Sequence, residues 1–232
     1  MRKIIQASIG LLVMVFSVSA LPPETDSKKN APEVPDLQKI KEEVNNPRSR
    51  YYYPELMKRY EVYDTTRLTI DDYRHLYLGA MYQEDYNPYR KSEYRDRIQE
   101  LYYRPDHSRP ELDSIIAYAE LSLADDPFDL EQMNYLIYAL KGRGKTNKAA
   151  IWQYRLNHLL QAIVSTGTGL DPENAWYVIN PRHEYNIVNF QNRVVESQQF
   201  QEPCYEYIKL VPLRSAGAFG SRRILFQHTS AA

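Results

Sequence analysis

The chain has 232 residues, of which 43% are hydrophobic and 25% are charged, and its formal net charge is −1. These values are typical of a globular protein and supply enough apolar side chains for one domain or two small ones. The absence of a basic patch or stripe argues against nucleic acid as a partner, and a single cysteine, Cys204, excludes an internal disulfide.

Residues 1–20 have the pattern of a bacterial secretory signal peptide. Arg2 and Lys3 form a basic start, residues 4–18 are mostly apolar, and Val18-Ser19-Ala20 offers small residues before a cleavage point. The alternative is a membrane anchor, but the apolar run is shorter than the roughly 20 residues that a bilayer span needs. We therefore expect cleavage after Ala20, a periplasmic or extracellular location, and no membrane span in the cleaved protein.

The mature chain is predicted to form a proline-rich linker and then a single domain. The linker covers residues 21–35, and the domain covers residues 36–211. Its first part, 36–166, is expected to be helical, since Asp36, Thr69 and Ser108 each stand where a side chain caps a helix start.

Three consecutive helices are expected between residues 111 and 164. The apolar residues there recur three and four positions apart, which is the period of an amphipathic helix. Pro127 marks the joint between the first and second helices, and Gly142 and Gly144 mark the joint between the second and third. Helices with such short links pack as antiparallel pairs.

The pattern becomes strand-like over residues 175–211. Short aromatic and β-branched runs predict a small antiparallel β meander packed on the helices. The runs are AWYVI, EYNIVNF, RVVESQQF and CYEYIKLV. The fold class is therefore predicted to be α+β and mostly α.

Residues 212–232 differ in composition from the rest of the chain. They contain no acidic residue and no sustained alternation, and only RILFQ at 223–227 could make a short strand. This shift is typical of a disordered tail, or of translation in a shifted reading frame after Pro212. We expect a tail without function.

No catalytic constellation stands out. Arg143-Gly144-Lys145-Thr146 ends like a phosphate-binding loop, but Ala139 occupies the position of the first glycine, which favours an interhelical turn. His183 and Glu184 lie between two predicted strands and could act as base and orienting group. They could also share a metal, but neighbours at alternating strand positions face opposite sides. The sequence predicts no metal and no cofactor.

Tyrosine is the most unusual feature of the composition, with 21 in the chain. Most of these tyrosines are expected to fill core and edge positions of the helices. Tyrosines in loops are better binding candidates, because they offer a rigid apolar ring with a polar tip. The predicted binding residues are Tyr51, Tyr52, Tyr53, Tyr86 and Tyr89.

Residues 130–163 resemble one tetratricopeptide repeat. Leu136 matches the leucine of its first helix, Gly144 the turn glycine and Ala149 the small residue of its second helix. Ile137 replaces the glycine at the tight position of the first helix. The resemblance implies helical hairpins that stack on their neighbours.

Residues 36–211 are similar to a family of exported proteins from Bacteroides-like bacteria that carries a domain of unknown function. The similarity lies in YYYPELMKRY, LTIDDYRHLYLGAMYQEDYNPY, DPFDLEQMNYLIYAL and GLDPENAWYVINPRHEYNIVNF. It implies a helical, tetratricopeptide-like part followed by a small β part, and it implies no activity.

The function expected from the sequence is a non-catalytic binding or scaffolding module of the cell envelope. Its partner would be an envelope protein or peptide, or a glycan. The alternative is an envelope hydrolase that uses His183 and Glu184.

Overall fold

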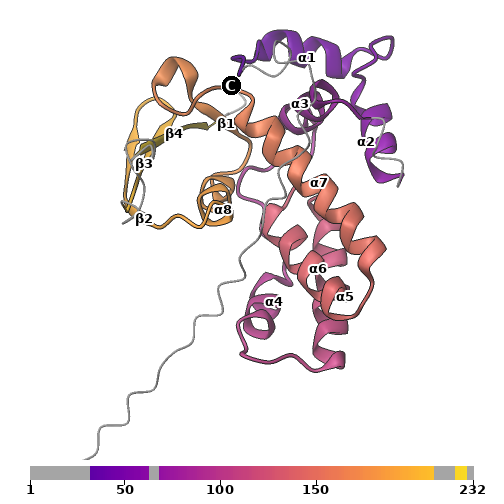
Figure 1. Cartoon of the computed structure of the whole chain (residues 1–232). Helices are drawn as coiled ribbons and strands as arrows, with labels where there is room; N and C mark the ends of the chain where they lie inside the picture. Colours follow the sequence, from indigo (N-terminus) through magenta and orange to yellow (C-terminus); the bar gives the residue numbers. More distant parts are fainter. Residues whose placement is uncertain (1–31, 63–67, 212–222, 229–232) are drawn as a thin grey trace, which may run out of the picture. The chain divides into compact units, whose positions relative to one another are not determined.

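The computed structural model describes residues 32–62, 68–211 and 223–228 (Figure 1). The predicted signal peptide at 1–20 and most of the linker at 21–35 lie outside these residues. Among the described helices, none combines the length and the apolar composition that crossing a bilayer requires.

Eight α-helices lie in the described part of the chain, and two short 3₁₀ helices accompany them. Their bounds are α1 (Leu37–Asn45), α2 (Tyr53–Glu61), α3 (Ile70–Gly79), η2 (Ala80–Tyr82), α4 (Arg95–Tyr102), α5 (Arg109–Asp125), α6 (Leu130–Gly142), α7 (Thr146–Val164), η3 (Pro172–Asn174) and α8 (Arg182–Phe190).

The predicted helix starts are confirmed at Asp36, Thr69 and Ser108. The Asp36 side chain accepts a hydrogen bond from the Lys39 amide, while Thr69 and Ser108 each head a complete capping box. These caps satisfy backbone N–H groups that have no partner inside the helix.

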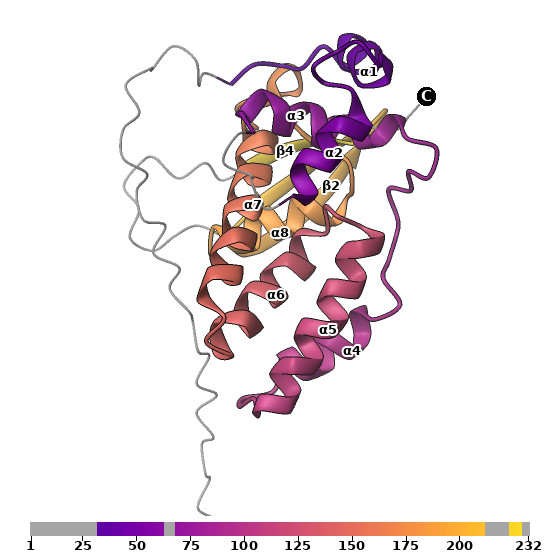
Figure 2. The same cartoon turned by 90° about the vertical axis from the view of Figure 1, so that its right-hand side faces the viewer.

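The three central helices expected from the sequence correspond to α5, α6 and α7, which pack consecutively on one another (Figure 2). Helix α3 packs on α7, and α1 and α2 pack on α3. Residues 143–145 form the turn between α6 and α7, with Gly144 at φ 71°, so the expected interhelical turn is confirmed. The tetratricopeptide resemblance stays a prediction.

Four strands form one mixed sheet: β1 (Trp176–Val178), β2 (Val195–Gln201), β3 (Tyr205–Leu210) and β4 (Arg223–His228). Their order is β1-β4-β3-β2. The β2–β3 and β3–β4 pairs are antiparallel, but β1 and β4 are parallel, with Trp176 opposite Phe226. The α+β, mostly helical class is confirmed, while the purely antiparallel meander is wrong at the β1–β4 pair.

Two of the predicted segments differ from the structure. EYNIVNF is part of helix α8, in which His183, Glu184, Ile187 and Val188 are buried with helical spacing. The expectation of a disordered tail is wrong for residues 223–228, because they form β4 between β1 and β3. Apolar Ile224, Leu225 and Phe226 are all buried there. The rest of the predicted tail lies outside the described residues.

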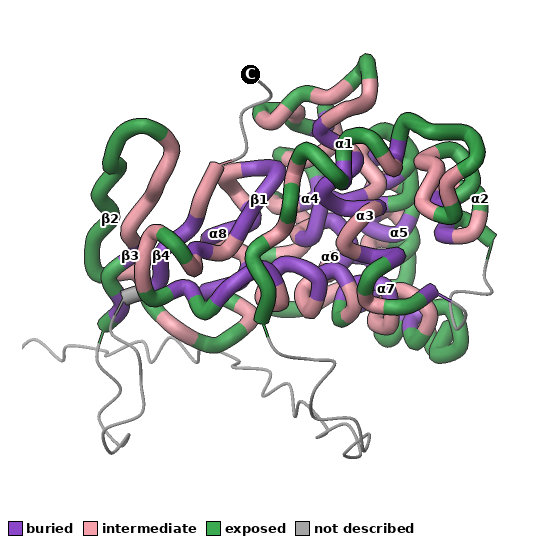
Figure 3. Tube along the Cα trace, turned by 90° about the horizontal axis from the view of Figure 1, so that it is seen from above, coloured by how far each residue is buried: buried purple, intermediate pink, exposed green. Residues whose placement is uncertain are grey.

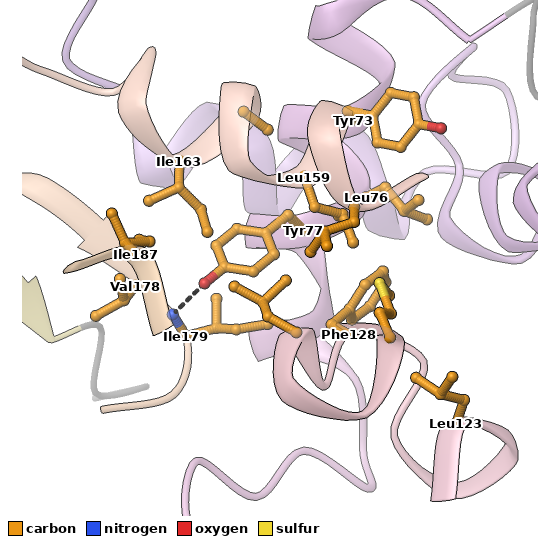
Figure 4. Close-up of a cluster of buried hydrophobic side chains, with 14 of the residues drawn as sticks. Tyr73, Leu76, Tyr77, Leu123, Phe128, Leu159, Ile163, Val178, Ile179 and Ile187 are labelled. Carbon is orange, nitrogen blue, oxygen red and sulfur yellow. Dashed lines mark hydrogen bonds between the residues drawn. The ribbon is translucent and has the colours of Figure 1, made fainter. Parts of the chain in front are cut away.

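The core runs from the helices into the sheet. Tyr77 of α3 lies among Leu159 and Ile163 of α7, Phe128 before α6, and Ile187 of α8 (Figure 4). Along the chain trace, burial is concentrated in the helical part, whereas β2 is exposed along most of its length (Figure 3).

Candidate functional site

Two of the five predicted binding tyrosines, Tyr53 and Tyr86, line the same surface cavity. The cavity encloses about 490 Å³ of empty space, part of it open to solvent. Its walls come from the start of α2, the segment after η2, the α5–α6 joint and the turn before α8. The lining residues are Tyr53, Ala80, Gln83, Asp85, Tyr86, Asn87, Arg90, Asp125, Asp126, Pro127, Phe128, Ile179, Asn180 and His183.

Tyr51 and Tyr52 do not join this cavity. The Tyr51 ring stacks on the His75 ring at a centroid distance of 3.6 Å, and the Arg50 guanidinium covers it at 4.8 Å. Tyr52 is the residue before α2 and is half-buried. The Tyr51 ring therefore serves packing against α3.

The loop from Asp85 to Arg90 forms one side of the cavity and is held at several points. The Tyr86 hydroxyl donates to the Ile179 carbonyl over 2.6 Å. Arg90 donates to the Asp125 carboxylate over 2.8 Å and to the Asp85 carbonyl over 2.6 Å. These bonds tie the loop to the α5 end and to the segment that follows β1.

Tyr89 stands on this anchored loop and remains 77% exposed. Its backbone N–H donates to the Asn87 side chain over 2.9 Å, which fixes the turn just before it. Arg182 from α8 also donates to the Arg90 carbonyl. The loop thus presents a large aromatic side chain to solvent on a defined backbone.

Asp126 is one of the acidic groups that line the cavity. Its carboxylate accepts from the Phe128 amide over 3.2 Å. Burial first, and then the nearby Asp129 carboxylate, raise the pKa of Asp126 to about 6. A basic or hydrogen-bond-donating group that enters the cavity would meet this carboxylate.

His183 also lines the cavity and is 3% exposed. The Ile179 amide donates to the Tyr77 hydroxyl over 3.2 Å, and that hydroxyl in turn donates to His183 Nδ1 over 2.7 Å. His183 also forms a hydrogen bond with the Phe128 backbone. Burial, assisted by the Arg182 charge, lowers the pKa of His183 to about 3, so the ring is neutral at physiological pH.

The structure does not bring His183 and Glu184 together. Both belong to α8 and both are buried, but Glu184 Oε1 lies 2.5 Å from Nε2 of His228 in β4. His183 instead faces Tyr77. The two side chains therefore have separate sets of partners, and the base-and-orienter arrangement expected for a hydrolase is not formed between them.

Sequence reasoning missed Tyr77 and His228 as partners of these two residues. Tyr77 fits the apolar pattern of a helix, which says nothing of its hydroxyl, and His228 lies in a segment without a clear strand pattern. The pairings join residues that are 106 and 44 positions apart, so no local spacing could reveal them.

The fold and the cavity define a mostly helical α+β protein with a tyrosine-lined surface site. A family model described as a domain of unknown function, DUF4919, matches residues 38–215, and the chain belongs to this family. No curated protein and no solved structure shows significant similarity to this chain.

Proposed function

We propose that this protein is an exported, non-catalytic binding module of the cell envelope that recognises a protein or peptide through the Tyr89 loop and the adjoining cavity. The observation that supports the proposal is that Tyr89 is 77% exposed on a loop in which Tyr86 and Arg90 are hydrogen-bonded to other segments. The export part of the proposal is supported by the signal-peptide pattern of residues 1–20.

The chemistry of the surface suits recognition. Tyrosine offers large contact area at a small cost in side-chain entropy, and it is among the residues that dominate binding energy at interfaces. A loop that is already ordered loses little further freedom when a partner binds. The half-buried Asp126 carboxylate beside it would accept from a Lys, Arg or amide group of the partner.

The test is affinity capture from envelope extract with the protein lacking residues 1–20. Tyr89→Ala should leave the melting temperature within about 1 °C of the parent protein, because the side chain touches mainly solvent, and should remove most of the captured partner. Tyr103→Ala is the matched control, since Tyr103 is 72% exposed but follows α4 rather than the cavity loop.

Equal capture by the parent protein and the Tyr89→Ala variant would contradict the proposal. Loss of capture with both tyrosine variants would show that exposed tyrosines associate nonspecifically, which also contradicts the proposal. Release of the captured material by free sugars would assign the surface to a glycan instead.

A further inference from the structure

Away from the cavity, three side chains with metal-ligating atoms converge from three elements: Glu184 of α8, Glu206 of β3 and His228 of β4. One ligand atom from each lies within 4.8 Å of the other two. Glu184 Oε1 is 2.5 Å from His228 Nε2, and Glu206 Oε2 is 3.5 Å from the same nitrogen.

The sheet register explains why two of these residues meet. Glu206 stands opposite Phe226 in the antiparallel β3–β4 pair, and His228 lies two residues beyond Phe226. Residues two apart share a face of a strand, so Glu206, Phe226 and His228 point to the same side of the sheet. Glu184 of α8 reaches His228 on that side.

The Glu184 carboxylate is in an unusual position for an acidic group. It is 0% exposed, and its Oε2 atom has no hydrogen-bond partner among the described residues. A buried carboxylate with an unpaired oxygen beside a second carboxylate is costly unless a positive charge lies between them.

We propose that Glu184, Glu206 and His228 bind a divalent transition-metal ion of the Zn²⁺ type. One imidazole nitrogen and two carboxylate oxygens are ligands that zinc accepts, and three protein ligands leave a further position open. An octahedral cation such as Mg²⁺ is a poorer match, because it prefers oxygen ligands alone.

The surrounding residues supply the support that a metal site requires. The Tyr185 hydroxyl donates to Glu206 Oε1 over 3.0 Å, and it also bonds to the Gln198 side chain. Such outer hydrogen bonds orient a ligating carboxylate. Glu206 and His228 keep side-chain exposures of 12% and 22%, which leaves an entry path for an ion.

Metal binding has a definite consequence for the Glu184–His228 contact. Metal–ligand distances of about 2.0–2.1 Å in a tetrahedral site place the ligand atoms roughly 3.3 Å apart. The two atoms are now 2.5 Å apart, so they must separate slightly to hold an ion between them.

The competing explanation is an ordinary buried ion pair between Glu184 and His228. The chain provides a matched comparison, because His75 Nε2 and Glu43 Oε2 form a similar contact of 2.8 Å on the helical side. Within the described residues, that pair is not part of a cluster of three ligands.

The experiment is a Zn²⁺ titration of the chelator-treated protein without residues 1–20, followed by calorimetry and by the melting temperature. We expect one ion per chain and a melting temperature that rises with zinc concentration. Glu206→Gln should weaken binding at least about tenfold, and Tyr185→Phe should weaken it by about tenfold, the range for outer-shell partners. Glu43→Gln should bind zinc as the parent protein does.

The Glu206→Gln and Tyr185→Phe variants keep the size of the side chain, and circular dichroism establishes that they are folded. No zinc binding by the parent protein would overturn the proposal. Unchanged affinity in both Glu206→Gln and His228→Asn would also overturn it, as would an equal loss of affinity in Glu43→Gln.

Discussion

The Tyr77 hydroxyl joins three parts of the chain in one buried line of hydrogen bonds. It accepts from the Ile179 amide and donates to His183, while His183 also bonds to the Phe128 backbone. Helix α3, the start of α6 and the end of β1 are thereby fixed to α8. The His183 ring is thus occupied by structural bonds.

Tyr77→Phe should lower the free energy of unfolding by about 1–3 kcal/mol. The change keeps the ring but leaves the Ile179 N–H and His183 Nδ1 buried without their partner. Urea unfolding measures the effect. Tyr89→Phe, at a position that is 77% exposed, should change the stability by less than about 0.5 kcal/mol, and an equal effect of the two variants would contradict the account.

Two groups at the cavity should shape the acid stability in opposite directions. The pKa of His183 is about 3, below its unfolded value, so between the two values the unfolded chain binds more protons and the free energy of unfolding falls with falling pH. The pKa of Asp126 is about 6, above its unfolded value, so its protonation in that window raises the free energy of unfolding as the pH falls.

Both effects can be tested by measuring the free energy of unfolding at pH 7 and at a pH of about 4.5. The lower pH lies between the shifted and the ordinary pKa values of both groups. His183→Gln should lose less stability on acidification than the parent protein, because a group that resists protonation has been removed. Asp126→Asn should lose more. The reverse order would show that the assigned charge states are wrong.

At the scale of elements, β4 completes the sheet. It pairs with β1 on one side and β3 on the other, and its residues Ile224, Leu225 and Phe226 are buried. Without β4, two strands would expose unpaired backbone groups, and the Trp176–Phe226 aromatic contact would be lost.

A chain that ends at Val211 should therefore unfold at a lower temperature and aggregate, whereas a chain that ends at His228 should keep the melting temperature of the full protein. Thermal unfolding and light scattering measure the two outcomes. Equal stability of both shortened chains would mean that β4 contributes nothing to the sheet.

The helices were more predictable than the strands for a physical reason. Capping residues such as Thr69 and Ser108 act over three positions, so their signal lies within the segment itself. The role of β4 depends on pairing with β1 and β3, which are distant in sequence. Before α8, Asn180 Oδ1 accepts from the Arg182 amide, and an asparagine followed by proline is equally typical of a turn between strands.

The candidate site was predictable only in part. Tyr86 and Tyr89 were identified because a proline-containing loop makes tyrosines accessible, yet Tyr86 proved to be an anchor and only Tyr89 remains largely exposed. The sequence predicted no metal site, since Glu184, Glu206 and His228 have no recognisable ligand spacing and meet only through the β3–β4 register.

At the scale of the whole molecule, the proposed function requires that the protein is exported. Protein isolated from its native host should begin at Leu21, because signal peptidase cleaves after small residues such as Ala20. N-terminal sequencing or mass spectrometry of the isolated protein provides the measurement. Recovery of the protein from the cytoplasm with Met1 retained would contradict export.

The central claim is that the loop carrying Tyr89 is a binding surface. Its most direct test replaces Tyr89 by a photo-crosslinking amino acid in the native host and compares it with the same replacement at Tyr103, which is 72% exposed. The account predicts a discrete crosslinked product of higher mass from position 89 and none from position 103. No product from position 89, or the same product from both positions, would contradict it.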